Sequence, residues 1–240
     1  MTFKDDGTRL FVTWGTTPRQ IKAFDLSTAW DVSTRSSSAV GTLTPAIQFS
    51  GFTQLRPTGL HFKPDGSSIF YSDFDSDKVV EHALSTAWDL NSASATATRS
   101  FQISGELRLE GLYISPDGTK MFVNGYNTDL IRRYDLSTAW DITTASATHN
   151  SQAITTVPLG LFFKSDGTKV FVVDNGQDRI RELTCPTPWD VNGLNINTHQ
   201  TSQLSVGSRD TAPNAVYISP DGNHLYFSGG QNDNVYQYDL

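Results

Sequence analysis

The stretch ISPDGTKMFVNGY at residues 114–126, followed by IRRYDLSTAWDI at residues 131–142, carries the pattern that decides the fold. Both phrases recur, with substitutions, along the whole chain. The aspartate of the Asp-Gly pair stands at positions 6, 65, 117, 166 and 221. The tryptophan of the second phrase stands at positions 30, 88, 140 and 189, and the fifth copy reads VYQYDL at 235–240. Self-similarity at a spacing of about fifty residues is typical of a repeat architecture.

Each repeat has the pattern of four short strands. In the second repeat we expect strands at 59–63, 68–71, 78–84 and 98–103, with fourth-strand counterparts at 46–50, 153–157 and 201–206. An Asp-Gly pair joins the first two strands, as in tight hairpins. The chain has no segment with helix-length periodicity. The sequence therefore predicts an all-β, five-bladed β-propeller of four-stranded antiparallel blades, with about nineteen strands and a last blade lacking its outer strand.

A single propeller domain is expected over residues 1–240, with blades at about 1–50, 51–103, 104–155, 156–205 and 206–240. The Ser-Thr-Ala-Trp stretch after the third strand is expected to form a capped turn whose indole packs against a neighbouring blade. Met1 aligns with Leu60, and Leu240 aligns with Leu136. We therefore expect the ring to close by side-chain packing, and the alternative, a piece of a longer propeller, stays open.

Composition restricts the class of partner. The 240 residues carry a net charge of −7, and only 18% of them are charged, which argues against nucleic acid and anionic membrane surfaces. No apolar run is long enough for membrane insertion. The single cysteine, Cys185, excludes an internal disulfide, and it replaces a leucine of the repeat, so we expect a buried thiol. The composition fits an extracellular surface without requiring one, and it does not indicate an oligomeric state.

The phrase at 115–124, followed by Ile131 and Asp135-Leu136, resembles the SPDG-type propeller repeats of TolB-like, lactonase-like and surface-layer proteins. The resemblance extends blade by blade over nearly the whole chain, although most such propellers have six or seven blades. The matching residues build turns and strand cores, so they identify blades and not an activity. Sugar lactonases, scaffolds and adhesion modules share such repeats. Five-bladed propellers of other sequence families include glycan-binding lectins and glycosidases.

Residues that break the repeat on the loop-rich face are candidates for ligand binding. Trp14 stands where other repeats have Asp or Gly, and Phe74 and Tyr126 follow in the neighbouring repeats. Exposed aromatic rings on a polar rim stack on sugars and other flat ligands. The loops leading into the first strands add hydrogen-bonding groups: Arg56, Glu106, Arg108, Glu110 and Asn214. The sequence predicts a module that binds glycan or a small polar ligand. The alternative is that the aromatic rings pack over the blade below.

The resemblance to lactonase-like propellers implies a second function, a metal-dependent hydrolase. Such propellers hold a divalent metal at the channel mouth with Glu, Asn and Asp. Glu110 and Asn214 match two of these types by position, and Asp174 is the nearest third ligand. A glycosidase needs paired carboxylates, whereas only Glu110 is clearly placed. A third function is architectural, in a surface or virion protein.

Asp73, Asp75 and Asp77 have the alternating spacing of a calcium loop. The sixth position is Lys78 instead of glycine, and the twelfth is Leu84 instead of glutamate. A calcium site between strands and a solvated acidic turn are both compatible with this pattern. The five histidines share no motif, which argues against a histidine-based metal or nucleophilic centre. We expect no prosthetic cofactor, with a divalent metal such as Ca²⁺ as the one alternative.

Overall fold

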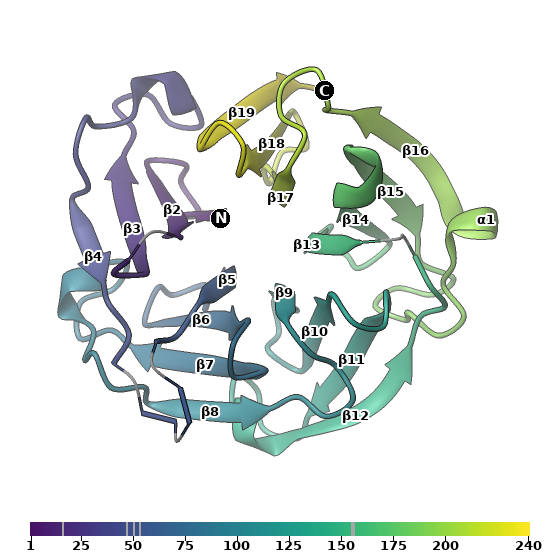
Figure 1. The fold of residues 1–240 in the computed structure, drawn as a ribbon, viewed down its shortest axis with the longest axis horizontal. Helices are drawn as coiled ribbons and strands as arrows, with labels where there is room; N and C mark the ends of the chain where they lie inside the picture. Colours follow the sequence, from purple (N-terminus) through teal and green to yellow (C-terminus); the bar gives the residue numbers. More distant parts are fainter. Residues whose placement is uncertain (16, 47, 50, 53, 155–156) are drawn as a thin grey trace.

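The computed structural model describes residues 1–240 except 16, 47, 50, 53 and 155–156, and it has five antiparallel sheets around a central axis (Figure 1). Four sheets have four strands each and the fifth has three, so the predicted five-bladed all-β propeller is confirmed. The chain runs outward through each blade, from a strand near the axis to a strand at the rim.

The strands occupy equivalent places in successive blades. The innermost strands are β1 (Thr2–Phe3), β5 (Pro57–Phe62), β9 (Leu109–Ile114), β13 (Pro158–Phe163) and β17 (Pro213–Ile218). The second strands are β2 (Arg9–Trp14), β6 (Ser68–Asp73), β10 (Lys120–Gly125), β14 (Lys169–Asp174) and β18 (His224–Gly229). The third strands are β3 (Gln20–Asp25), β7 (Lys78–Ala83), β11 (Ile131–Leu136), β15 (Arg179–Thr184) and β19 (Asn234–Asp239). The outer strands are β4 (Gly41–Leu43), β8 (Arg99–Gln102), β12 (Ala145–Asn150) and β16 (Gln200–Ser205).

Short helices connect some of these strands. Three single-turn 3₁₀ helices, η1 (Val32–Thr34), η2 (Leu90–Ser92) and η3 (Ile142–Thr144), follow the tryptophan turns. A fourth, η4 (Asn175–Gln177), follows β14, and α1 (Ile196–His199) precedes β16. No helix in the described part of the chain is long and apolar enough to cross a membrane.

Two of the four expected outer strands were wrongly placed. β8 and β16 lie where the sequence predicts them, but the outer strands of the first and third blades are Gly41–Leu43 and Ala145–Asn150, not 46–50 and 153–157. Positions 47, 50, 155 and 156 lie outside the described residues. An outer strand pairs on one side only and is largely exposed, as β12 is, so it lacks the apolar alternation that locates buried strands.

The Asp-Gly turn and the tryptophan of each repeat form one packed unit. Gly118 has a φ of +72°, which favours glycine, and a Cβ there would lie 2.3 Å from the Trp140 ring. The Trp140 amide donates to the Gly118 carbonyl at 2.9 Å, and Asp141 caps η3 by accepting from the Thr143 amide. The first, second and fourth blades repeat this arrangement at Trp30, Trp88 and Trp189.

Each indole also packs against the preceding blade, as expected. The centroid of the Trp140 ring lies 6.1 Å from those of both His61 and Phe70 in the second blade. Trp189 lies at the same distance from Phe122 in the third blade. The tryptophan turn is thus an element that holds neighbouring blades together.

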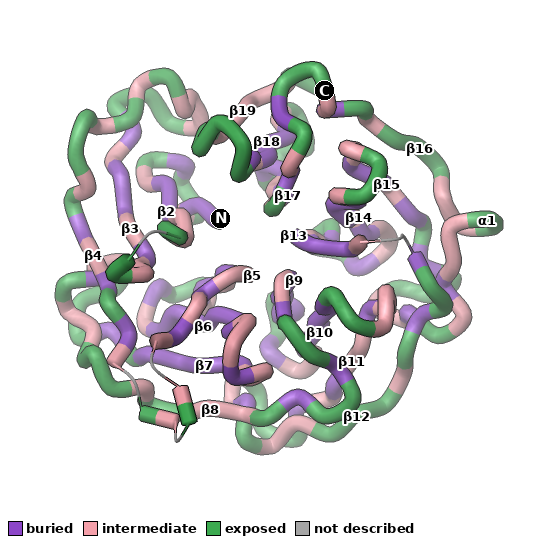
Figure 2. The backbone as a smooth tube through the Cα atoms, in the orientation of Figure 1, coloured by how far each residue is buried: buried purple, intermediate pink, exposed green. Residues whose placement is uncertain are grey.

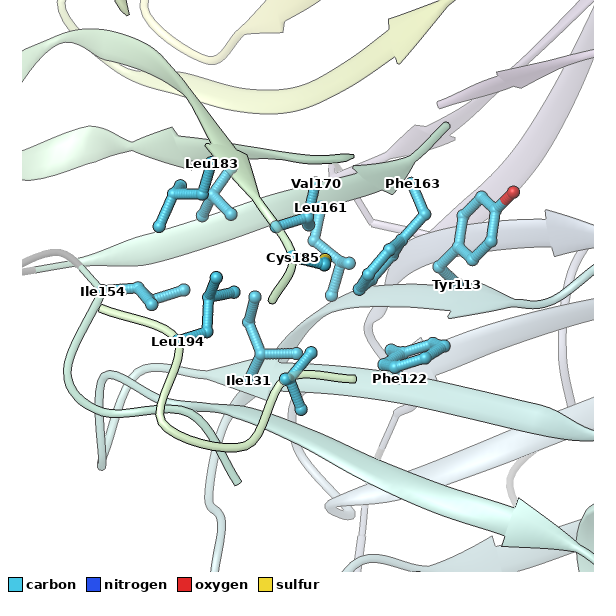
Figure 3. Close-up of a cluster of buried hydrophobic side chains, with 12 residues drawn as sticks. Tyr113, Phe122, Ile131, Ile154, Leu161, Phe163, Val170, Leu183, Cys185 and Leu194 are labelled. Atoms are coloured by element: carbon cyan, nitrogen blue, oxygen red, sulfur yellow. The ribbon is translucent and has the colours of Figure 1, made fainter. Parts of the chain in front are cut away.

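The buried hydrophobic clusters each join residues of adjacent sheets, so the core lies between the blades. Figure 2 shows buried positions mainly on the strands and exposed positions mainly on the connecting loops. One cluster joins the third and fourth blades through Phe122, Ile131, Phe163 and Leu183 (Figure 3). Cys185 belongs to this cluster, and burial raises the pKa of its thiol to about 12. The prediction of a buried cysteine is confirmed.

Small residues let the inner strands approach one another near the axis. A Cβ at Gly111 would lie 2.1 Å from the Asn124 Oδ1 atom and 2.7 Å from the Leu159 carbonyl oxygen of the next blade. Gly59 and Gly160 face equally close backbone atoms of their neighbours. Glycine at this position therefore sets the narrow diameter of the ring.

Side-chain packing joins the fifth blade to the first. Met1, Phe3 and Leu10 share a buried cluster with Tyr226 of β18. The Tyr226 hydroxyl donates to the Trp30 carbonyl at 2.6 Å, across the join. No strand is exchanged between the two blades in the described sheets, so side chains make the contact between them.

Candidate functional site

A cavity of about 740 Å³ opens at the loop-rich end of the axis. Its lining includes four of the predicted residues, each from a different blade: Trp14 at the end of β2, Arg56 before β5, Glu110 on β9 and Asn214 on β17. The sequence predicts all four as ligand-binding residues, and the fold brings them together around one space. The cavity is of the size that binds small molecules in proteins.

The cavity also borders the first blade, whose inner strand β1 consists of two residues. β1 pairs with β2 only through Thr2 with Phe11 and Phe3 with Leu10. In the second blade the corresponding pairing extends to Pro57 with Asp73. The last residues of β2, including Thr13 and Trp14, therefore face the cavity directly.

Trp14 presents an aromatic face at this opening. Its side chain is 38% exposed, and the Lys22 ammonium lies 4.1 Å from the ring centroid. Lys22 lies on β3, opposite Val12 in the register of the β2–β3 pair, so the two strands fix the ring beside the ammonium group. The result is a partly supported indole, which is suited to stacking on a ligand.

Glu110 supplies a carboxyl group with an altered pKa. Burial raises the pKa from its ordinary value of 4.5 to about 7, and the nearby Arg56 guanidinium opposes this rise. Near neutral pH the group is therefore present in both forms. As a carboxylic acid it donates a hydrogen bond, and as a carboxylate it accepts.

Asn214 lies across the cavity on β17, where it is exposed. Its amide faces the Gly230 amide nitrogen and the Ala212 carbonyl oxygen, each at 3.2 Å. These contacts fix its orientation at the rim.

The other two predicted aromatic residues lie outside the lining of this cavity. Phe74 has the Arg56 guanidinium 4.1 Å from its ring centroid and that of Arg108 at 5.8 Å. Arg108 also lies 5.9 Å from the ring of Tyr126, which is 49% exposed. These four side chains form a stack of alternating rings and cations on the rim. The alternative weighed for the aromatics, packing onto the protein itself, thus describes Phe74 better than Tyr126.

Glu106 is fully buried and organises a loop. Its carboxylate accepts hydrogen bonds from the amides of Asn127 and Thr128, from the Thr128 hydroxyl and from the Arg132 guanidinium. A carboxylate occupied in this way is not available to a ligand at the cavity, so the structure gives Glu106 a structural role.

The three aspartates of the suspected calcium loop point to different partners. Asp73 is buried and accepts from the amides of Arg56 and Ser76. Asp75 pairs with Arg19 at 2.6 Å. Asp77 accepts from the Arg108 amide at 2.6 Å. Since the carboxylates do not converge, this loop does not fit a calcium ion.

The second candidate metal set is not assembled either. Asp174 is buried in an ion pair with Arg181, at 2.6 Å between its Oδ2 atom and Nη2, and it does not line the cavity of Glu110 and Asn214. Among the described residues, no three His, Cys, Asp or Glu side chains form a group that could hold a metal ion. The donor set that the resemblance implied is therefore reduced to Glu110 and Asn214.

Sequence reasoning did not identify Arg19 and Lys22 as parts of the site. Both line the cavity: the Arg19 guanidinium lies beside Asp75, and the Lys22 ammonium lies beside the Trp14 ring. Arg19 lies just before β3, and Lys22 lies on it. Neither position identifies a ligand site in the sequence, since a basic residue on a strand usually marks a solvated face.

No protein-family model matches the chain, and no curated protein matches it in sequence. Solved structures do resemble it in fold. A candidate 6-phosphogluconolactonase from Bacteroides uniformis is 15% identical over 99% of this chain and 66% of that one, with a TM-score of 0.55. The periplasmic gluconolactonase PpgL of Pseudomonas aeruginosa is 13% identical over 99% of this chain and 64% of that one, with a TM-score of 0.53.

A structure of Kuenenia stuttgartiensis hydrazine synthase is also similar, with 14% identity over 99% of this chain and 70% of that one, and a TM-score of 0.52. The chain thus spans about two thirds of the length of the lactonase structures. At these identities the similarity concerns the β-propeller fold alone, since both the lactonase structures and the hydrazine synthase structure match it.

Proposed function

We propose that this propeller recognises a glycan or another small polar ligand in the cavity at its loop-rich end. The observation that supports the proposal is the convergence of Trp14, Arg56, Glu110 and Asn214, from four different blades, on one space of about 740 Å³. An aromatic face beside a carboxyl, a guanidinium and an amide matches a sugar ring, which offers an apolar face and a belt of hydroxyls. The turns at 115–118 and 219–222 support the further proposal that the blades are of the SPDG type.

A glycan-array screen with the intact chain tests this function. We expect binding to one class of sugar, and its loss in Trp14→Ala. Tyr126→Ala is the matched control, because Tyr126 is also an exposed aromatic residue but lies outside the cavity lining. Equal loss in both variants, or no binding by a folded sample, would contradict the proposal.

A hydrolase of the lactonase kind is the second candidate function, and it is supported by Glu110. A carboxyl group with a pKa of about 7 at a channel mouth is suited to general acid–base catalysis near neutral pH. The chemistry would be attack of water on a lactone or ester carbonyl, with the Glu110 carboxylate accepting a proton from the water. The acyl C–O bond would then break, and the Glu110 carboxylic acid would return the proton to the departing oxygen. A panel of lactones tests it: activity that survives Glu110→Gln unchanged excludes this role.

A further inference from the structure

The second and third blades carry an arginine and an aromatic residue at the same two positions. Arg56 precedes β5 and Arg108 precedes β9, and these two strands are neighbours in the ring (Figure 1). The Arg56 carbonyl accepts a hydrogen bond from the Phe74 amide at 3.0 Å. The Arg108 carbonyl accepts one from the Tyr126 amide at 3.2 Å. The backbone therefore holds each aromatic residue beside its arginine.

The fold uses this backbone contact without requiring these side chains. In the fourth blade the same hydrogen bond joins the Asn175 amide to the Val157 carbonyl at 3.0 Å. In the fifth blade it joins the Gly230 amide to the Ala212 carbonyl at 2.9 Å. Two blades thus make the contact with neither an arginine nor an aromatic ring. The arginines and rings of the second and third blades are therefore not needed to form a blade, and they are available for a function.

A single ring brings the two guanidinium groups together. The guanidinium carbon of Arg56 lies 4.1 Å from the centroid of the Phe74 ring, and that of Arg108 lies 5.8 Å from it. Arg56 is half-buried, and Arg108 is exposed. In the part of the chain that the structure describes, no ion pair joins either guanidinium to a carboxylate. We call Arg56 and Arg108 the arginine pair.

The acidic groups of the neighbouring loops do not neutralise the arginine pair. Asp75 pairs with Arg19 at 2.6 Å, and the buried Glu106 pairs with Arg132 at 3.3 Å. Burial raises the pKa of Glu110 to about 7, so a large part of this group is uncharged at neutral pH. The whole chain carries a net charge of −7. Two unpaired cations side by side therefore reverse the prevailing charge at this part of the rim.

Two guanidinium groups close together suit one anionic oxygen group. A guanidinium donates parallel N–H bonds to such a group, and these charge-assisted bonds are stronger than bonds between neutral groups. An anion bound to both arginines would also offset the repulsion between their like charges. Contact with the Phe74 ring restricts both side chains already, which reduces the conformational entropy that they lose when a ligand binds.

We propose that Arg56 and Arg108 together bind the anionic group of an acidic sugar, a carboxylate or a sulfate. The inference rests on the function proposed above, because Arg56 lines the cavity, while Arg108 lies outside its lining. The sugar ring occupies the cavity, and its charged substituent extends toward the third blade. Arg56 has five N–H donors, so it can bond a hydroxyl of the sugar and the anionic group at the same time.

Glycans that differ only in charge test this inference on the intact chain. Each set on an array holds a neutral sugar, the corresponding uronate and the corresponding 6-sulfate. We expect one charged member of a set to bind about tenfold more tightly than the neutral member, and the two charged arms show which anion fits. Equal binding of neutral and charged members would overturn this inference and leave the proposed function standing. Binding of no member would contradict both.

A matched pair of variants locates the anion. Arg108→Gln removes the charge from a residue outside the cavity lining, and we expect about tenfold weaker binding of the charged glycan, measured by calorimetric titration. Arg209→Gln is the control, because it removes the same charge from an exposed residue that does not line the cavity either. Unchanged binding by Arg108→Gln, or equal loss in both variants, would overturn the inference. Trp14→Ala reports separately on the proposed function, since it should weaken the binding of charged and neutral glycans alike.

Discussion

At the scale of single residues, the same residue type has different roles according to its surroundings. Glu106 and Glu110 lie four positions apart, yet the first is fully buried in a network of donors, while the second lines a cavity and receives little compensation for its burial. Sequence reasoning predicts both as ligand-binding, because a single chain carries no information on which donors surround a carboxylate. For the same reason, the sequence does not predict that the guanidinium groups of Arg56 and Arg108 stack on Phe74.

The pKa of Glu110 leads to a prediction about stability and pH. Burial raises the pKa in the folded state from 4.5 to about 7, so between these values the folded chain binds more protons than the unfolded chain. Stability therefore falls as the pH rises through this window. One pKa unit corresponds to about 1.4 kcal/mol, and partial solvation of the cavity reduces the total, so we expect Glu110→Gln to be more stable than the wild type by about 1–2 kcal/mol at pH 8.

Denaturant unfolding at pH 4 and pH 8 measures this effect. At pH 4, below both pKa values, the carboxyl is mostly neutral in both states, and the two proteins should unfold at nearly the same denaturant concentration. If the variant is no more stable than the wild type at pH 8, interactions with neighbouring groups offset the cost of burying the Glu110 carboxylate, and the prediction is wrong.

At the scale of strands and turns, the repeated features were predictable and the unrepeated ones were not. The Asp-Gly turn and the tryptophan recur at fixed positions in the first four blades because each of these blades makes the contact between Gly118 and Trp140, or its equivalent. Strands buried on both faces have strong apolar patterns, and they were predicted within a few residues. The outer strands β4 and β12 were misplaced: β4 has only three residues, Gly41–Leu43, and the largely exposed β12 has no apolar alternation.

The glycine at the inner strands gives a prediction for this scale. Gly111→Ala would place a methyl group 2.1 Å from the Asn124 Oδ1 atom, which accepts a hydrogen bond from the Gly111 amide. The Leu159 carbonyl of the next inner strand lies on the other side, so the added methyl group cannot move away from Asn124. We therefore expect a loss of about 2 kcal/mol in unfolding free energy. Gly15→Ala, where no atom lies within 4 Å, is the control and should change stability by about 0.5 kcal/mol or less. Comparable effects at both sites would contradict the tight packing at the axis.

At the scale of the whole molecule, the cores lie between blades, so the stability of each blade depends on its neighbours. The join between the fifth and first blades uses the same kind of contact as the other joins, with Trp30 stacked on Tyr217 at 6.2 Å. The two ends of the axis differ in what they present. The loop-rich end carries polar groups and Trp14, whereas the turn end carries Phe162 and Phe171.

The join between blades leads to a prediction for the ring. Tyr226→Phe removes the hydrogen bond to the Trp30 carbonyl while keeping the buried ring, and we expect a loss of about 1 kcal/mol in unfolding free energy. Tyr236→Phe is the matched control, since that hydroxyl bonds to the Arg209 carbonyl at 3.0 Å within the fifth blade and is exposed. If Tyr226→Phe unfolds as the wild type does, the join contributes less than its geometry indicates.

The central claim is that the loop-end cavity binds a polar ligand, and a crystal structure with a sugar found by the array tests it most directly. We expect the ligand in the cavity, with its ring stacked on Trp14 and its hydroxyls bonded to Glu110, Arg56 and Asn214. A ligand seated on Tyr126 or on the side of a blade, with the cavity filled by water alone, would contradict the claim.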